Sequence, residues 1–327
     1  MRASGLVLGY LADRLLGDPS SFHPVAGFGK LAAACERAWY ADSRGRGVVH
    51  AAALAGGAFI SGCALERVAR RLPGGSTALT AVTCWAVLGG RSLEKEALAV
   101  HALLAAGDLA GARQRLTHLV GRDTSALDEA EIARAAIESV AENTSDAVVA
   151  PLLWGALAGP AGMVAYRATN TLDAMVGHRS DRYRQFGWAS ARLDDLLNLP
   201  AARLSGGLVM LAAPSRAEAA RRAWRRDAGA HPSPNAGVAE AAFAGSLDLR
   251  LGGTNDYGGV VEHRAILGSG PPPVSDDIIR AVRLAGRVGW LAMTAAVALA
   301  GARRPGRPRP AGPHSRPPSC AGPGSRG

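Results

Sequence analysis

The strongest constraint on the fold of this chain is a set of long segments that carry no charged side chain. Residues 48–65, 72–90, 147–166 and 288–302 contain no Asp, Glu, Lys or Arg and are rich in Gly and Ala. A helix that spans a bilayer needs about 20 predominantly apolar residues, whereas the helices of soluble bundles normally carry a charged outer stripe. We therefore expect an all-α, polytopic integral membrane protein, in preference to a soluble helical core.

A fifth segment, residues 196–213, is a weaker candidate because Asn198 and Arg203 lie in its first half. With it, the sequence predicts four or five spans. The abundance of Gly and Ala fits close packing of helices in lipid, where small side chains let backbones approach.

The formal charge of +10 is unevenly distributed along the chain. Residues 303–327 hold six arginines and no acid among many Pro and Gly residues, so more than half of the net charge belongs to this tail. A segment of this composition cannot bury enough apolar surface to fold. We expect a membrane domain over residues 1–302, a disordered basic tail over residues 303–327, and no binding of nucleic acid.

A polar section without proline, residues 91–146, lies between the second and third apolar segments. We expect two helices here, with a break at V-G-R-D-T-S, residues 120–125. Thr124 or Ser125 is the expected N-cap of the second helix, because a short hydroxyl side chain satisfies free amides of the first turn.

The second of these helices ends in a run of acids, E-S-V-A-E-N-T-S-D, at residues 138–146. Glu138, Glu142 and Asp146 follow one another at four-residue steps, so they share one broad helix face just before an uncharged segment. Carboxylate oxygens are the ligands that Mg²⁺ prefers, and such a face would position Mg²⁺ together with phosphate groups. The alternative is the solvated face of an ordinary amphipathic helix.

The third apolar segment separates this acidic face from a second polar section that begins at Arg167. A single crossing would place Glu138 and Asn170 on opposite sides of the membrane. They share a side if residues 147–166 form a re-entrant hairpin that bends back at Gly159 and Pro160. Non-helical backbone at membrane depth is tolerated only within protein or beside a wet cavity, so such a bend would mark a site.

Further polar clusters follow the acidic run in order. They are Y-R-A-T-N-T-L-D-A-M-V-G at residues 166–177, R-L-D-D at residues 192–195 and H-P-S-P-N-A-G at residues 231–237. The whole succession resembles the CobD/CbiB family of cobalamin biosynthesis over about residues 5–300, and the basic tail has no counterpart there. Shorter motifs of the same succession lie at residues 17–19, 23–25, 91–93, 121–124 and 186–187.

The resemblance implies a multi-pass protein of the cell membrane that acts as an adenosylcobinamide-phosphate synthase. Such an enzyme joins aminopropanol or its phosphate to the free propionate of adenosylcobyric acid, forming an amide with consumption of ATP. A carboxylate is a poor electrophile, so an acyl phosphate or similar activated ester is the economical intermediate. ATP and Mg²⁺ are the implied cofactors and the corrinoid is a substrate. The other implied partners are the lipid bilayer and further cobalamin-assembly enzymes at the membrane.

The resemblance also gives each polar cluster a role. The three acids of the run would position Mg²⁺ and phosphate, with Glu138 and Glu142 in the catalytic centre. Arg122 and Arg167 would hold phosphate oxygens or a corrin carboxylate, because a planar guanidinium binds two oxygens at once. His231 would accept a proton from the amine. The other residues of the expected polar pocket are Asn143, Asn170, Asp173, Asp194 and Asp195.

Two other classes of function fit parts of the pattern. An intramembrane Mg²⁺-dependent prenyltransferase would clamp a diphosphate with Asn170, Asp173 and the pair Asp194 and Asp195, but a paired D-x-x-x-D repeat is missing. A non-enzymatic transporter or scaffold would use the polar groups as a permeation path, but we find no inverted repeat in the sequence. The synthase accounts for all of the clusters and is the preferred hypothesis.

Removal of the basic tail tests whether apolar burial holds the protein in the membrane. A chain truncated after Ala302 loses the six tail arginines and none of the expected spans. It should still sediment with membranes after a high-salt wash, because salt screens charge and leaves apolar burial intact. Recovery of the truncated protein in the soluble fraction would contradict the membrane-span interpretation.

Overall fold

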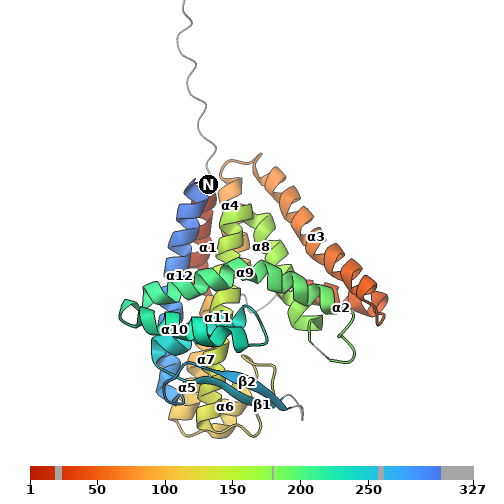
Figure 1. The fold of residues 1–327 in the computed structure, drawn as a ribbon. Helices are drawn as coiled ribbons and strands as arrows, with labels where there is room; N and C mark the ends of the chain where they lie inside the picture. The colour runs from red at the N-terminus through yellow and green to blue at the C-terminus, as the bar shows by residue number, and fades with distance from the viewer. Residues whose placement is uncertain (19–23, 179, 257–260, 303–327) are drawn as a thin grey trace, which may run out of the picture.

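The computed structural model describes residues 1–18, 24–178, 180–256 and 261–302, and it is helical apart from one antiparallel β-hairpin (Figure 1). Pro19, His23 and the basic tail lie outside the described residues. The helices are α1 (Arg2–Leu16), α2 (Pro24–Trp39), α3 (Arg44–Ala69), α4 (Gly75–Val87), α5 (Gly90–Ala105), α6 (Leu109–Leu116), α7 (Glu129–Thr144), α8 (Ala150–Val176), α9 (Trp188–Ala212), α10 (Ala217–Asp227), α11 (Ala236–Leu247) and α12 (Ser275–Ala302). A π-helical turn (Ser145–Val149) joins α7 to α8, short 3₁₀ turns (Pro214–Arg216 and Ala228–Ala230) flank α10, and the strands are β1 (Leu251–Asp256) and β2 (Val261–Leu267).

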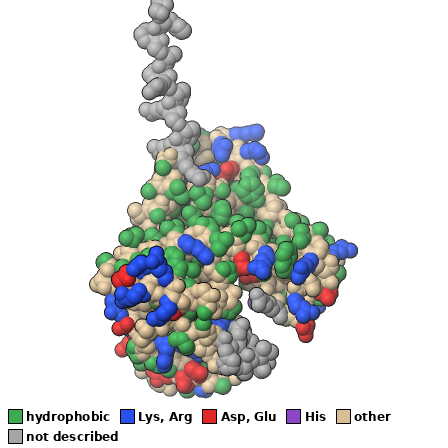
Figure 2. Space-filling view, in the orientation of Figure 1, with side chains coloured by type: hydrophobic (Ala, Val, Ile, Leu, Met, Phe, Trp, Pro, Cys, Tyr) green, Lys and Arg blue, Asp and Glu red, His purple; other side chains and the backbone are tan. Residues whose placement is uncertain are grey.

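The molecule divides into an apolar part and a polar part (Figure 2). Helices α1, α3, α4 and α12 form much of the apolar part, and its outer surface includes the exposed side chains of Leu8, Phe59, Ile60, Val82 and Trp290. An apolar surface of this extent is uncommon in soluble monomers. Charged side chains gather below it, over α10 and around the hairpin, and a smaller group lies at the opposite end (Figure 2).

The described residues contain three helical stretches long and apolar enough to cross a membrane: α3, α12 and the run Glu129–Val176, which is bent at the non-helical backbone of Gly159. Helix α9 and the segment Pro214–Ala230, which bends from it by 107°, count as a fourth if they form one broken span. These stretches confirm the predicted polytopic helical membrane fold.

One predicted span is shorter than expected. Residues 72–90 form α4, which has only 13 residues. The helix packs along α1 at very close range, because Gly5 and Gly9 of α1 lie against Thr80 and Cys84 of α4. A β-carbon added to Gly9 would lie 2.4 Å from Cβ of Cys84, so only glycine permits this approach. Helix α4 therefore belongs to a packed helix pair and falls short of an independent span.

The third apolar segment bends back on itself as a hairpin. Gly159 has φ 68° and ψ −156°, a backbone conformation that is almost restricted to glycine, and Pro160 follows it. Gly155 before the bend lies against the side chain of Met163 after it, so the two halves of α8 pack together. The bend lies beside Arg2 and Glu66 at the far end of the apolar part. The chain thus returns to the side from which it came, as the hairpin alternative requires.

The polar section before α7 differs in detail from the prediction. It forms three helices, because Gly107, with φ 73°, separates α5 from α6. The N-cap of α7 is Asp128, so the predicted caps Thr124 and Ser125 are wrong. Asp128 and Glu131 form a capping box, in which each side chain accepts a hydrogen bond from the other residue's backbone amide. This reciprocal pair satisfies two free amides, more than a single hydroxyl does.

Residues 214–277 contain several Pro and Gly clusters, which favour turns, yet they form more regular structure than this composition indicates. They hold the amphipathic helix α10, the fully buried helix α11 and the β-hairpin. The hairpin is a local exception to the all-α prediction. Gly252 at its start has φ 82°, and an added β-carbon would lie 2.0 Å from the carbonyl oxygen of Ala265. The tight pairing of the two strands therefore depends on this glycine.

Substitution of Gly159 tests the hairpin bend. Gly159→Ala should destabilise the protein by about 1–3 kcal/mol, because alanine strongly disfavours this backbone conformation and its methyl group would collide with Glu66. Thermal unfolding in detergent should show a clear drop in Tm. Gly56→Ala is the matched control, since this glycine lies in α3 with no atom within 4 Å of an added β-carbon. Equal Tm values for the two variants would contradict a strained bend.

Candidate functional site

The acidic helix α7 is enclosed by protein. Every residue from Ile132 to Ala141 is buried, and α5, α11, α12 and β1 pack around the helix. Its first turn is open to solvent, where Glu129 is exposed, and Glu142 and Asn143 near its end are half-buried. The alternative of a solvated acidic face is therefore wrong, and the acids of α7 must be compensated inside the protein.

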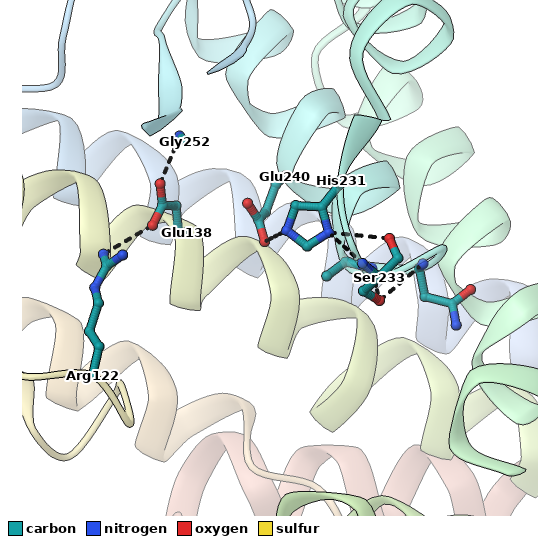
Figure 3. A network of polar contacts seen from close by, with 8 residues as sticks. Arg122, Glu138, His231, Ser233, Glu240 and Gly252 are labelled. Carbon is teal, nitrogen blue, oxygen red and sulfur yellow. Dashed lines mark hydrogen bonds and ion pairs between the residues drawn. The ribbon is translucent and has the colours of Figure 1, made fainter. Parts of the chain in front are cut away.

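Glu138 is compensated by a guanidinium and a backbone amide (Figure 3). One carboxylate oxygen accepts a 3.0 Å hydrogen bond from Arg122, and the other accepts a 2.8 Å hydrogen bond from the backbone N–H of Gly252. Only 4% of the Arg122 side chain and 7% of the Glu138 side chain are exposed. Arg134, one turn earlier on α7, donates to the carbonyl oxygens of Gly252 and Thr254. These contacts fasten the hairpin and the loop after α6 to α7.

A small cavity of about 130 Å³ lies beside this ion pair. Its charged lining side chains come from four parts of the chain: the loop after α6, α7, α11 and β2. Binding sites for larger organic ligands typically measure about 300–1,000 Å³, so this cavity suits a small molecule or one end of a larger one. The charged residues of this cavity, which we call the glutamate cavity, are Arg122, Glu138, Glu142, Glu240 and Arg264.

Glu240 and Arg264 are cavity residues that the sequence analysis missed. Glu240 is the only ionisable residue of α11, and only 1% of it is exposed. Burial raises the pKa of the Glu240 carboxyl well above its usual range, and the carboxylates of Glu138 and Glu142 raise it further. The sequence did contain a signal for Glu240, because it is the single charged residue within residues 236–247.

The predicted residues of α8 and α9 form a second polar group, which we call the aspartate cluster. Asp194 accepts a 2.9 Å hydrogen bond from the amide of Asn198, and the Tyr166 hydroxyl lies 2.8 Å from the Asn198 amide oxygen. Arg167 donates a 3.2 Å hydrogen bond to Asn170, whose own amide lies 3.5 Å from Asp194. The structure thus brings Arg167, Asn170 and Asp194 together, as predicted.

The glutamate cavity and the aspartate cluster meet around the π-helical turn. Asp146 lies close enough to Glu142, Asp194 and Asp173 to be repelled by their charges, and close enough to Arg167 to be attracted by its charge. Because α8 bends back at Gly159, acids from α7, α8 and α9 reach one region although α8 separates them in sequence. Two predicted site residues, Asn143 and Asp195, have hydrogen-bond or ion-pair partners on their own helices. Asn143 donates back to Ser139 within its own helix, and Asp195 pairs with Arg192 at 3.8 Å on the outer side of α9.

The acids of the run offer an incomplete site for a metal ion. Within the described ranges, no group of three His, Cys, Asp or Glu side chains is placed to hold one ion. Both oxygens of Glu138 are already hydrogen-bonded, whereas Glu142 and Asp146 accept no hydrogen bond from any described residue. Mg²⁺ commonly binds through one or two carboxylates together with substrate phosphates and water. Glu142 and Asp146 fit such a role, and the metal assignment stays a prediction.

His231 lies next to the glutamate cavity (Figure 3). Its Nδ1 accepts a 3.1 Å hydrogen bond from the backbone N–H of Ser233, and its Nε2 lies 3.6 Å from Glu240. The loop that carries it is held to α9, because Asn235 donates to the carbonyl oxygen of Asp195 and accepts from Arg203. The predicted proton acceptor therefore contacts the carboxylate that the sequence analysis missed.

The fold and the site define a polytopic helical membrane protein with an enclosed site of mixed charge. The sequence model of the CobD/Cbib protein family matches residues 6–285. Among curated relatives, "Cobalamin biosynthesis protein CobD" of Mycobacterium tuberculosis is 48% identical over 93% of this chain and 97% of its own length. The protein of the same name from Chromobacterium violaceum is 45% identical over 91% of this chain and 96% of its own length, and that from Rhodobacter capsulatus is 44% identical over 86% and 92%. No solved structure matches. This chain belongs to the CobD/CbiB family of cobalamin biosynthesis.

Loss of the buried ion pair tests its structural contribution. Arg122→Gln leaves the Glu138 carboxylate buried beside neighbouring acids, so it should destabilise the protein by about 3–5 kcal/mol. The exposed pair of Glu218 and Arg221 is the control, because a pair in solvent contributes little. Glu218→Gln should leave the Tm in detergent unchanged. A similar Tm for both variants would show that the buried pair does not stabilise the fold.

Proposed function

We propose that this protein is an adenosylcobinamide-phosphate synthase, which joins aminopropanol phosphate to the free propionate of adenosylcobyric acid by ATP-dependent amide formation. Family membership limits the role to cobalamin biosynthesis. The single observation that supports the specific reaction best is the mixed charge of the glutamate cavity. An aminoalkyl phosphate carries an ammonium group and a phosphate group, and the cavity offers both carboxylates and guanidinium groups.

The two ends of this substrate have separate partners in the cavity. The guanidinium groups of Arg122 and Arg264 would bind phosphate oxygens, because each presents several N–H donors in one plane. Glu142 and Glu240 would bind the ammonium group, since Glu138 is already paired with Arg122. At about 130 Å³, the cavity suits this small substrate and is too small for a corrin ring. The corrinoid would therefore present only its propionate at the cavity mouth.

The aspartate cluster would hold ATP and the activated propionate. Mg²⁺, when bound by Glu142 and Asp146, would neutralise phosphate charge during transfer to the propionate. Arg167 would bind a phosphate oxygen or a corrin carboxylate and is held in place by Asn170. Asp173 and Asp194 would complete the polar wall of this part of the site. The bilayer would surround the apolar helices, which places the reaction at the membrane surface.

A direct assay tests the proposed activity. Purified membranes that contain the protein should convert adenosylcobyric acid, aminopropanol phosphate, ATP and Mg²⁺ to the corrinoid amide, which mass spectrometry detects. Replacing aminopropanol phosphate with aminopropanol tells which amine is the donor. Absence of the amide with both amines would contradict the proposed function.

Neutralising Glu142 tests its assignment to Mg²⁺ and the ammonium group. Glu142→Gln keeps the size of the side chain and removes its charge, so turnover should fall by about 100-fold or more, equivalent to about 3 kcal/mol of lost transition-state stabilisation. Glu129→Gln, at the exposed start of the same helix, should stay near wild-type activity. Equal activity of the two variants would remove Glu142 from the reaction.

A further inference from the structure

Helix α11 contains a buried acid that no structural role explains. The helix is A-G-V-A-E-A-A-F-A-G-S-L, and all of its 12 residues are buried. A carboxylate without a hydrogen-bond donor on its buried Oε1 costs folding free energy in such surroundings. Acids kept at that cost, next to a cavity and close to other charged groups, are candidates for a chemical role. Glu240 meets this description because its carboxylate faces the glutamate cavity.

His231 lies beside the Glu240 carboxylate (Figure 3). Nδ1 lies 3.1 Å from the backbone nitrogen and 3.2 Å from the carbonyl oxygen of Ser233. In the tautomer in which Nδ1 accepts from the N–H of Ser233, the neutral ring carries its proton on Nε2, the atom 3.6 Å from Glu240. Only 4% of the His231 side chain is exposed. Gly237 leaves the space for it, because a β-carbon there would lie 2.5 Å from Cβ of His231. The ring therefore holds Nε2 within ion-pair distance of Glu240, farther than a hydrogen bond.

We infer that Glu240 is the proton acceptor for the amine in the proposed amide-forming reaction, and that His231 is a positioning residue that orients the Glu240 carboxylate. Glu240 lines the cavity in which the ammonium group would bind, and His231 lies on the other side of that carboxylate (Figure 3). This inference rests on the proposed function. It replaces the earlier prediction that His231 itself takes the proton.

Amide formation from an ammonium group requires a proton acceptor. An amine attacks an acyl group only through the lone pair of its neutral form, so the ammonium group must lose a proton before or during attack. In the step we infer, the ammonium group loses one N–H proton to Glu240, the freed nitrogen lone pair forms the C–N bond, and the C–O bond of the acyl phosphate breaks. Phosphate leaves with that electron pair and takes the second N–H proton from the nitrogen. The products are the amide, hydrogen phosphate and a proton held by Glu240, which then passes to solvent.

Hydroxylamine separates proton removal from the other steps. It is largely uncharged at neutral pH, so it attacks an acyl phosphate without a protein base and gives a hydroxamate. Glu240→Gln should lower kcat for aminopropanol phosphate by about 100-fold or more, in the range expected for loss of a general base. This kcat is measured at saturating amine, because Glu240 would also bind the ammonium group and its loss should raise KM. Hydroxamate formation from adenosylcobyric acid, ATP and hydroxylamine should continue at nearly the wild-type rate.

Three further variants exclude a merely structural effect. Glu94→Gln removes a buried acid that does not line the glutamate cavity, one that pairs with Arg14, and should leave the ratio of the two reaction rates unchanged. His231→Gln should lower kcat for the amine less than Glu240→Gln does, with normal hydroxamate formation. The double variant of His231 and Glu240 should be no worse than Glu240→Gln alone, because a positioning residue acts through its partner. If Glu240→Gln fails to fold, Glu240→Asp should show the same selective loss of the amine reaction.

The outcomes distinguish this inference from the proposed function. Amide formation by Glu240→Gln at the wild-type rate would overturn the assignment of Glu240 alone. Equal loss of amide and hydroxamate in a folded Glu240 variant would also overturn it, because the residue would then serve activation of the propionate. Failure of the wild-type protein to form either product would overturn the proposed function and this inference together.

Discussion

The bend at Gly159 is the constraint on which the arrangement of the site depends. A helix that continued straight through residues 147–166 would carry α9 to the far end of the apolar part. Because the backbone reverses at Gly159, the second half of α8 packs along the first half and α9 begins beside the π-helical turn. Asp146 then interacts with Asp173 and Asp194, and one acidic region forms from three helices. The bend is compatible with membrane depth because Gly159 and Pro160 are themselves buried in protein.

Buried charge is the second feature that organises the molecule. Glu138 joins α7 to the loop after α6 and to the hairpin, so a single carboxylate links three segments that are far apart in the sequence. Glu142, Asp146 and Glu240 lack such complete compensation. Glu240 is buried, Glu142 and Asp146 are half-buried, and acids in such positions beside a cavity are candidates for binding a ligand or taking part in a reaction. The proposed amine and Mg²⁺ sites are therefore assigned to these residues.

Sequence reasoning named most of the residues that the structure groups into the candidate site, and it missed Glu240 and Arg264 for physical reasons. The four-residue spacing of Glu138, Glu142 and Asp146 is readable because helical periodicity is local. The burial of α7 on all sides was not readable, since it depends on α11 and the hairpin. Glu240 was not predicted as a site residue because its helix lies between a Pro-rich and a Gly-rich cluster, and such clusters indicate turns. Local hydrogen bonds also explain the capping error, since Asp128 and Glu131 compete better for the first turn of α7 than Thr124 does.

Labelling of single cysteines from one side of the membrane tests the hairpin bend most directly. In a protein whose four natural cysteines are replaced, cysteine would be introduced at exposed Ser125, before α7, and at exposed Asp181, after α8. A third cysteine at exposed Pro73 would report on the far end of α3. With a membrane-impermeant maleimide and sealed vesicles, the first two positions should react from the same side and the third from the other. Reaction of Ser125→Cys and Asp181→Cys from opposite sides would contradict the account.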